Sequence, residues 1–269
     1  MHIDYMKRTR SPFDRVLRLA IGLVRYSVRA SSGVHSDNPI RVYALGQLSK
    51  MASEARSVRL LLWFGRLHEA VPLRRSISEG LANLCWMVGG PGDAEARADM
   101  LLAAHEVDIS RGIQSQARLN NKNPAHFLPR NDPFSHLATL ADERRGIAAN
   151  WERLSIDEKE RYIPLDSKLM QEVFRKLKSD GNTFLHSRPE AIENFLVENS
   201  HGLLAQLHPN PIEHTRETER AFSLQMCAEC LRIGSSVIAE AFGFDASSLH
   251  TQLKSVWEEA FERARRKRG

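Results

Sequence analysis

The stretch LRRSISEGLANLCWMVGG, residues 73–90, constrains the fold of this chain more than any other part of it. Its branched apolar residues recur every three or four positions, a spacing that places them in one stripe along a helix. That stripe consists of Leu73, Ile77, Leu81, Leu84 and Val88. Ala82, Cys85 and Trp86 are apolar but lie off the stripe. Because a helix that is apolar nearly all round is buried on several sides, we expect a central helix over residues 73–88.

Signals for helix starts recur along the rest of the chain. Ser11 precedes a proline, and Asp37 and Asn38 precede Pro39. Ser, Asp and Asn accept N–H hydrogen bonds at a helix start, and proline suits the first helical position because no N–H partner is lost there. The helix that begins near Asn38 is expected to run on to Pro72, which ends or kinks it.

Helical patterns continue to the C-terminus and set the fold class. Further helices are expected over residues 93–119, 134–153, 155–162, 166–180, 188–207, 213–242 and 246–267. We find no convincing strand, because no stretch alternates apolar and polar residues clearly. The sequence therefore predicts an all-α fold, a multi-helix bundle of about eight to ten helices around a buried central helix.

The domain organisation is expected to be simple, with residues 1–269 forming a single helical domain. Within it, residues 8–31 are expected to form a basic N-terminal helix and residues 262–269 a basic tail. Residues 120–133, NNKNPAHFLPRNDP, are dense in Asn and Pro and are expected to form a surface loop.

The positive charge of the chain is concentrated at its two ends. The formal net charge is +5; residues 1–30 hold seven Lys and Arg against two Asp, and the last eight residues hold five against Glu262. Such ends could bind RNA or another polyanion. Alternatively, basic residues at the C-terminus complete a helix by opposing its macrodipole. Both interpretations stay open at this point.

Neither a membrane span nor a metal site is predicted. The apolar stretch VLRLAIGLVRYSV is interrupted by Arg18 and Arg25, too often for a transmembrane helix, so a cytoplasmic location is expected. Cys227 and Cys230 form a Cys-x-x-Cys pair inside a helical pattern, without the second pair of ligands that structural zinc needs. We expect these thiols to pack in the core, and we expect no metal and no cofactor.

Arg75 and Glu79 are the first candidates for chemistry. They lie four residues apart on the central helix, opposite its leucine stripe, and are expected to be paired and partly buried. Arg74 and Ser78 flank them. The pair could be structural and lock the central helix against a neighbour. It could also belong to an anion or nucleotide pocket in which Arg74 and Ser78 bind the ligand.

A second candidate is His208, in the stretch HGLLAQLHPNP. The proline after it prevents simple helix continuation, so His208 would lie at a helix C-terminus, where the dipole favours a protonated imidazole. His201, seven residues earlier, would share its face and is a weaker candidate. Asn210, in the turn that follows, is a candidate ligand-binding residue. The histidines lack a carboxylate at firm ligand spacing, which argues against a metal site.

These segments resemble a known family. The stretches RRSISEGLANLCWMV, GDAEARADMLLAAHE and HGLLAQLHPNP are similar to the bacterial helical family named domain of unknown function 5677. Members share an Arg-x-x-x-Glu pattern, which maps onto Arg75 and Glu79, and a later Tyr-x-x-Leu-Ser-x-x-His turn, which maps onto 201–208. The Tyr and Ser of that turn are replaced here by His201 and Ala205. Of the three polar residues in the family's turn, this chain therefore keeps only the histidine, as His208.

The resemblance, which spans roughly residues 40–245, implies an all-helical domain loosely similar to the HEPN class of ribonuclease toxins and defence proteins. In that class an Arg steadies the scissile phosphate while a His a few residues later moves a proton. Arg29 with His35 and Arg130 with His136 have such a spacing. Composition alone produces several such matches by chance, so Arg130 and His136 are only weaker catalytic candidates.

Two functions follow from these residues. In the first, Arg75 binds a phosphate, His208 is the acid or base and Glu79 orients one of them, in a metal-independent ribonuclease or nucleotide-acting enzyme of a defence or toxin system. In the second, the same residues form a structural network in a non-catalytic binding or regulatory module, which forms a homodimer through an apolar helix face. Loss of activity without loss of stability in Arg75→Ala would favour the enzyme.

Overall fold

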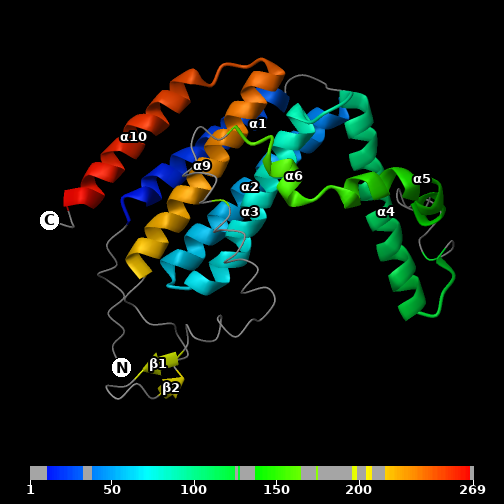
Figure 1. Cartoon of the computed structure of the whole chain (residues 1–269), viewed down its shortest axis with the longest axis horizontal. Coiled ribbons are helices and arrows are strands. Elements are labelled where there is room, and N and C mark those ends of the chain that lie inside the picture. Colours follow the sequence, from blue (N-terminus) through cyan, green and yellow to red (C-terminus); the bar gives the residue numbers. More distant parts are fainter. Residues whose placement is uncertain are drawn as a thin grey trace.

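The computed structural model describes residues 11–32, 38–124, 127, 137–164, 174, 196–198, 204–207 and 216–266, and this part of the chain is mainly helical (Figure 1). The predicted all-α class is confirmed. The helices are α1 (Phe13–Ser32), α2 (Pro39–Trp63), α3 (Leu67–Gly89), α4 (Ala94–Leu119), α5 (Leu137–Arg153), α6 (Ile156–Glu160), α9 (Arg216–Phe242) and α10 (Ser247–Arg266).

The predicted central helix is α3, and it belongs to a body that also contains α1, α2 and α9 (Figure 1). Residues of its leucine stripe are fully buried, among them Ile77, Leu81 and Leu84. Ala82 and Trp86, off the stripe, are buried as well, so α3 is covered on several sides. It packs against α2, α9 and α6. The apolar residues around the whole circumference of this helix therefore predicted its burial correctly.

Helix starts follow the predicted caps. The hydroxyl of Ser11 accepts a hydrogen bond from the Phe13 N–H at 3.4 Å. The Asn38 side chain accepts from the Ile40 N–H at 3.0 Å, and Pro39 occupies the first turn of α2. Ser155 forms a capping box at the start of α6. Each cap satisfies N–H groups that have no partner inside the helix.

The prediction of one helix from Asn38 to Pro72 was wrong. The chain ends α2 at Trp63 and turns at Gly65, whose φ of 74° lies in the left-handed region. The Arg66 N–H donates to the Leu61 carbonyl at 2.8 Å, which completes a glycine-dependent helix end. Pro72 lies inside α3 instead, in its second turn, where its missing N–H removes a single helical hydrogen bond.

The predicted helix over residues 188–207 was also wrong where the structure describes it. Strands β1 (Leu196–Glu198) and β2 (Leu204–Leu207) pair antiparallel, with Leu196 opposite Leu207 and a register shift after Val197. The sequence between them contains Asn199 and Gly202, residue types that favour turns over helix interiors. The predicted helix over residues 166–180 lies outside the described residues except Phe174, which is buried.

Helices α4 and α5 pack against each other and stand apart from the body (Figure 1). A small second core of Ala103, Val107 and Ala148 joins them. The connection from α3 to α4 is fixed by Arg97, whose side chain is only 7% exposed. Its guanidinium donates to the carbonyls of Met87, Val88, Gly90 and Gly92 at 3.1, 3.2, 2.7 and 2.7 Å. One side chain therefore caps the C-terminus of α3.

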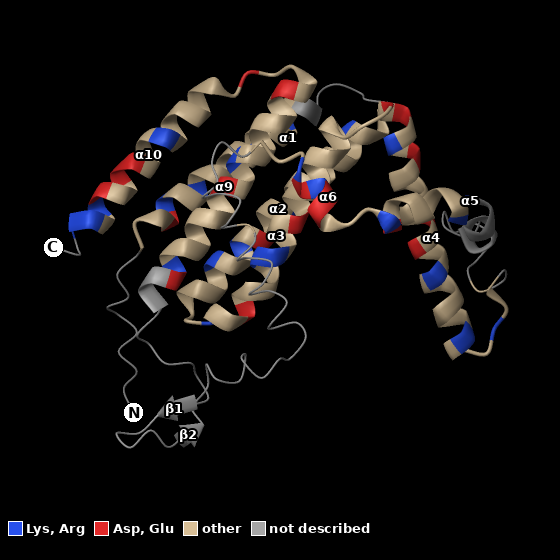
Figure 2. Cartoon of the chain, in the orientation of Figure 1, with Lys and Arg blue, Asp and Glu red and all other residues tan. Residues whose placement is uncertain are grey.

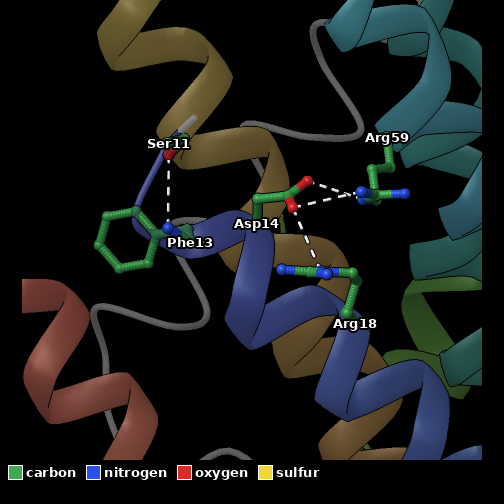
Figure 3. A network of polar contacts seen from close by, with 5 residues as sticks. All are labelled: Ser11, Phe13, Asp14, Arg18 and Arg59. Atoms are coloured by element: carbon green, nitrogen blue, oxygen red, sulfur yellow. Dashed lines mark hydrogen bonds and ion pairs between the residues drawn. The ribbon is translucent and has the colours of Figure 1, made fainter. Parts of the chain in front are cut away.

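A second buried charge ties α1 to α2 (Figure 3). The carboxylate of Asp14, 5% exposed, accepts two hydrogen bonds from Arg59 of α2, at 2.6 and 3.3 Å. Arg18, one turn along α1, lies 3.3 Å from the same carboxylate. Both arginines keep part of their surface in water, so only the negative charge depends on these contacts for its solvation.

All three cysteines of the chain are free thiols buried in the core, as expected for Cys227 and Cys230. Cys85 is contributed by α3, the other two by α9. Burial raises the pKa of the Cys85 and Cys227 thiols to about 12 and raises that of Cys230 as well. A thiol with so high a pKa is not a nucleophile at neutral pH.

Candidate functional site

The Arg74 side chain, one of the predicted ligand-binding residues, is buried in the core. It is 3% exposed, its Nη1 donates to the Ser223 hydroxyl at 2.8 Å, and the same nitrogen lies 3.6 Å from the Glu219 carboxylate. Ser223 in turn donates to the Glu219 carbonyl at 2.6 Å. Since both partners belong to α9, the buried Arg74 guanidinium connects the central helix to that helix through a hydrogen bond and an ion pair whose carboxylate is 31% exposed.

Arg75 and Glu79 form the ion pair that their spacing predicted. The Arg75 Nε lies 2.6 Å from the Glu79 carboxylate, and the two side chains are 19% and 34% exposed. The Ser78 hydroxyl donates to the Arg75 carbonyl at 2.8 Å, so its hydrogen is used inside the helix. The four predicted residues of α3 therefore contact protein groups, although the buried Nε of Arg74 has no hydrogen-bond partner among the described residues.

Lys159 of α6 extends this polar region, although no pattern in the sequence pointed to it. Its ammonium lies 3.4 Å from the centre of the Trp151 ring, and the residue is 6% exposed. Trp151 packs edge-on against Trp86 of α3, with ring centres 5.3 Å apart. Burial lowers the pKa of Lys159 to about 8, while the charge of Glu79 acts in the opposite direction. The short stretch IDEKE otherwise resembles an ordinary exposed helix.

Lys159→Met is expected to change how stability depends on pH. Below pH 8 the folded and unfolded chains both hold the Lys159 proton. Between pH 8 and the ordinary lysine pKa of 10.5, the unfolded chain still binds a proton that the folded chain has lost, so this residue makes stability rise with pH. We expect wild type to gain about 1 to 2 kcal/mol over the variant across that window, allowing for screening.

Urea unfolding of both proteins at several pH values measures this difference. The buried thiols titrate in the same range but are common to both chains, so their contribution cancels in the comparison. Parallel pH profiles for wild type and variant would contradict a lowered Lys159 pKa.

Several predicted site residues lie outside the described residues. These are the catalytic candidate His208, the weaker candidates His201, Arg130 and His136, and the ligand-binding candidate Asn210. Their approach to Arg75 and Glu79 stays a prediction. The Arg and His pairs with HEPN-like spacing likewise stay predictions, since His35 also falls outside.

The basic C-terminus can be compared with its two interpretations. Arg263, Arg265 and Arg266 occupy the last turn of α10, seen as the blue end of that helix in Figure 2. Arg263 lies 3.7 Å from Glu259, and Arg266 lies 3.5 Å from Glu262. Pairing within the helix and opposition to its dipole account for these arginines without a polyanion.

A groove between α9 and α10 is a further candidate that the sequence did not reveal. Its volume is about 520 Å³, and its lining residues are Glu229, Arg232, His250, Thr251, Lys254, Trp257, Glu258 and Phe261. The guanidinium of Arg232 donates to both carboxylate oxygens of Glu229, at 2.8 and 2.6 Å. Burial and the charge of Arg232 lower the pKa of His250, which favours its neutral form. The pattern His250, Lys254, Trp257 and Phe261 was the available signal, because this spacing follows one helix face.

No helix in the described part of the chain is long and apolar enough to cross a membrane. Within the same part, no group of three His, Cys, Asp or Glu side chains is placed to hold a metal ion. Neither a protein-family model, nor a curated protein, nor a solved structure matches this chain. The resemblance to the helical family of unknown function therefore stays a prediction.

Proposed function

We propose that this chain is a non-catalytic helical binding or regulatory module, which acts as a homodimer and uses its Arg–Glu network for structure. The observation that carries the proposal is the burial of Arg74, 3% exposed and paired with Ser223 and Glu219 of α9. An arginine that binds a phosphate must face solvent or a cleft. This one is enclosed by protein and joins two core helices.

The competing function is a metal-independent enzyme that acts on RNA or nucleotides in a bacterial defence or toxin system. It is favoured by the partial exposure of Arg75 and Glu79, at 19% and 34%. A phosphate could reach Arg75 at its exposed edge, although binding there competes with the Glu79 carboxylate for the guanidinium. The basic ends would then recruit RNA by charge, with an affinity that falls steeply with salt.

The two functions are separated by measuring stability and activity on the same variants. Arg74→Met keeps much of the apolar stem but removes the buried charge, and we expect it to lower the free energy of unfolding by about 2 kcal/mol. Arg75→Ala is expected to cost about 1 kcal/mol, because its pair is partly solvated. Arg25→Met, at an exposed position of α1, is the control and is expected to leave stability unchanged.

Activity is measured by incubating wild type, Arg75→Ala and His208→Ala with total cellular RNA and with a tRNA pool. We expect no cleavage by any of them. Cleavage by wild type but not by an equally stable Arg75→Ala or His208→Ala protein would replace the proposed function with the ribonuclease. Full stability of Arg74→Met would remove the structural argument itself.

A further inference from the structure

Helix α10 carries two neighbouring stripes of side chains. Leu253, Val256 and Ala260 are buried, and this helix packs against α1. The next stripe around the helix contains Trp257 and Phe261 and lines the groove over α9. Phe261 is 43% exposed although it touches Phe13 of α1, with ring centres 5.3 Å apart. An aromatic stripe left half open beside a buried one is typical of a surface that binds another helix.

The groove contains charges of both signs, and some of them form ion pairs while others do not. Glu229 and Arg232 are paired with each other. Lys254 and Glu258 are both exposed, four residues apart on the groove-lining face of α10, and neither forms an ion pair with any described residue. Two acids therefore balance two bases. A groove without net positive charge does not attract a polyanion, which would need an excess of cations.

We infer that the groove is the homodimer interface, with α10 of one copy lying antiparallel to α10 of its partner. A two-fold axis near residue 256 places Lys254 opposite the partner's Glu258, and Glu258 opposite the partner's Lys254. Both positions lie two residues from the axis, about 3 Å along the helix. The two free charges of one copy then become two intermolecular ion pairs, while Trp257 and Phe261 of both copies fill the groove.

A second copy fits this surface better than an unrelated partner because the pattern is complementary to itself. A two-fold interface brings the same patch together from both sides, so every contact is made twice. The inference rests on the proposed binding function, for which it names the partner and the contact residues.

Charge reversal tests both the surface and the register. Lys254→Glu and Glu258→Lys each place like charges opposite one another twice per dimer, and we expect each to weaken dimerisation by at least about tenfold. The double variant Lys254→Glu/Glu258→Lys restores opposite charges across the axis and is expected to dimerise within about threefold of wild type. Lys122→Glu, exposed beyond the end of α4, makes the same charge change away from the groove.

The measurement is sedimentation equilibrium of the full-length chain over micromolar concentrations, with thermal midpoints to check that each variant is folded. A monomeric wild type, single reversals without effect, or a double variant as weak as the singles would each overturn the inference. A wild-type monomer that binds a single-stranded oligoribonucleotide, and loses it in Lys254→Glu, would assign the groove to nucleic acid instead. A monomeric wild type would also remove the homodimer from the proposed function, whereas a wild-type dimer that the single reversals do not weaken refutes this interface alone.

Discussion

Arg97→Met is expected to lower the free energy of unfolding by about 4 kcal/mol, the largest effect of any substitution considered for this chain. The Arg97 guanidinium donates to carbonyls of Met87, Val88, Gly90 and Gly92, at the end of α3 and in the turn that follows. Methionine fills a similar volume without a donor, so the buried Met87 carbonyl and the part-buried carbonyls of Val88 and Gly90 lose their charged partner. The favourable contact between a cation and the C-terminal dipole of α3 is lost as well.

Guanidinium chloride unfolding of wild type and Arg97→Met measures this effect. Arg97→Lys keeps the charge but cannot reach several carbonyls at once, so an intermediate loss is expected. Arg118→Met, at an exposed position of the same helix, is the control and should change stability by less than about 0.5 kcal/mol. If Arg97→Met lost no more stability than this control, water would have to hydrogen-bond the carbonyls at the end of α3 in place of Arg97.

Asp14→Ala is expected to cost about 3 kcal/mol, the second largest effect. Its carboxylate is 5% exposed and accepts two hydrogen bonds from Arg59, so the variant removes a charge-assisted bridge between α1 and α2 (Figure 3). The loss stays below that of Arg97 because Arg59 is 37% exposed and can be solvated by water when its partner is gone.

A double-mutant cycle assigns this loss to the pair. Arg59→Met leaves the buried carboxylate with Arg18 only, and we expect it to destabilise more than Arg18→Met, because Arg18 is 51% exposed and makes one longer contact. The double variant Asp14→Ala/Arg59→Met should be more stable than the sum of the single losses predicts, by about 1 to 2 kcal/mol. Simple additivity of the two losses would mean that the bridge contributes nothing beyond side-chain packing.

Local patterns in the sequence predicted most of the helices. Ser11 and Asn38 cap the helices that they were expected to begin. A cap is a contact between residues two or three positions apart, so residue type and spacing suffice to find it. The exceptions were segments in which two local signals compete. Pro72 predicts a helix end at its own position, but the left-handed turn at Gly65 ends the helix earlier.

In the candidate site, too, only contacts between residues close in sequence could be predicted. Arg75 and Glu79 are one helical turn apart, and their pairing follows from that spacing. The partner of Arg74 is Ser223, 149 residues further along the chain, and no pattern in the sequence connects them. The groove could not be predicted for a related reason. It exists because α9 and α10 both pack on α1 and leave space between them, which is a property of the assembled helices.

The rate at which the three buried thiols are alkylated measures how often the folded chain opens. An alkylating reagent modifies thiolates, so the raised pKa values and burial of Cys85, Cys227 and Cys230 keep the folded chain unlabelled. Each modification adds a fixed mass, and its rate reports how often the thiol reaches solvent. The thiols belong to α3 and α9, the helices that Arg74 joins, so the natural cysteines record the separation of those two helices without any introduced probe.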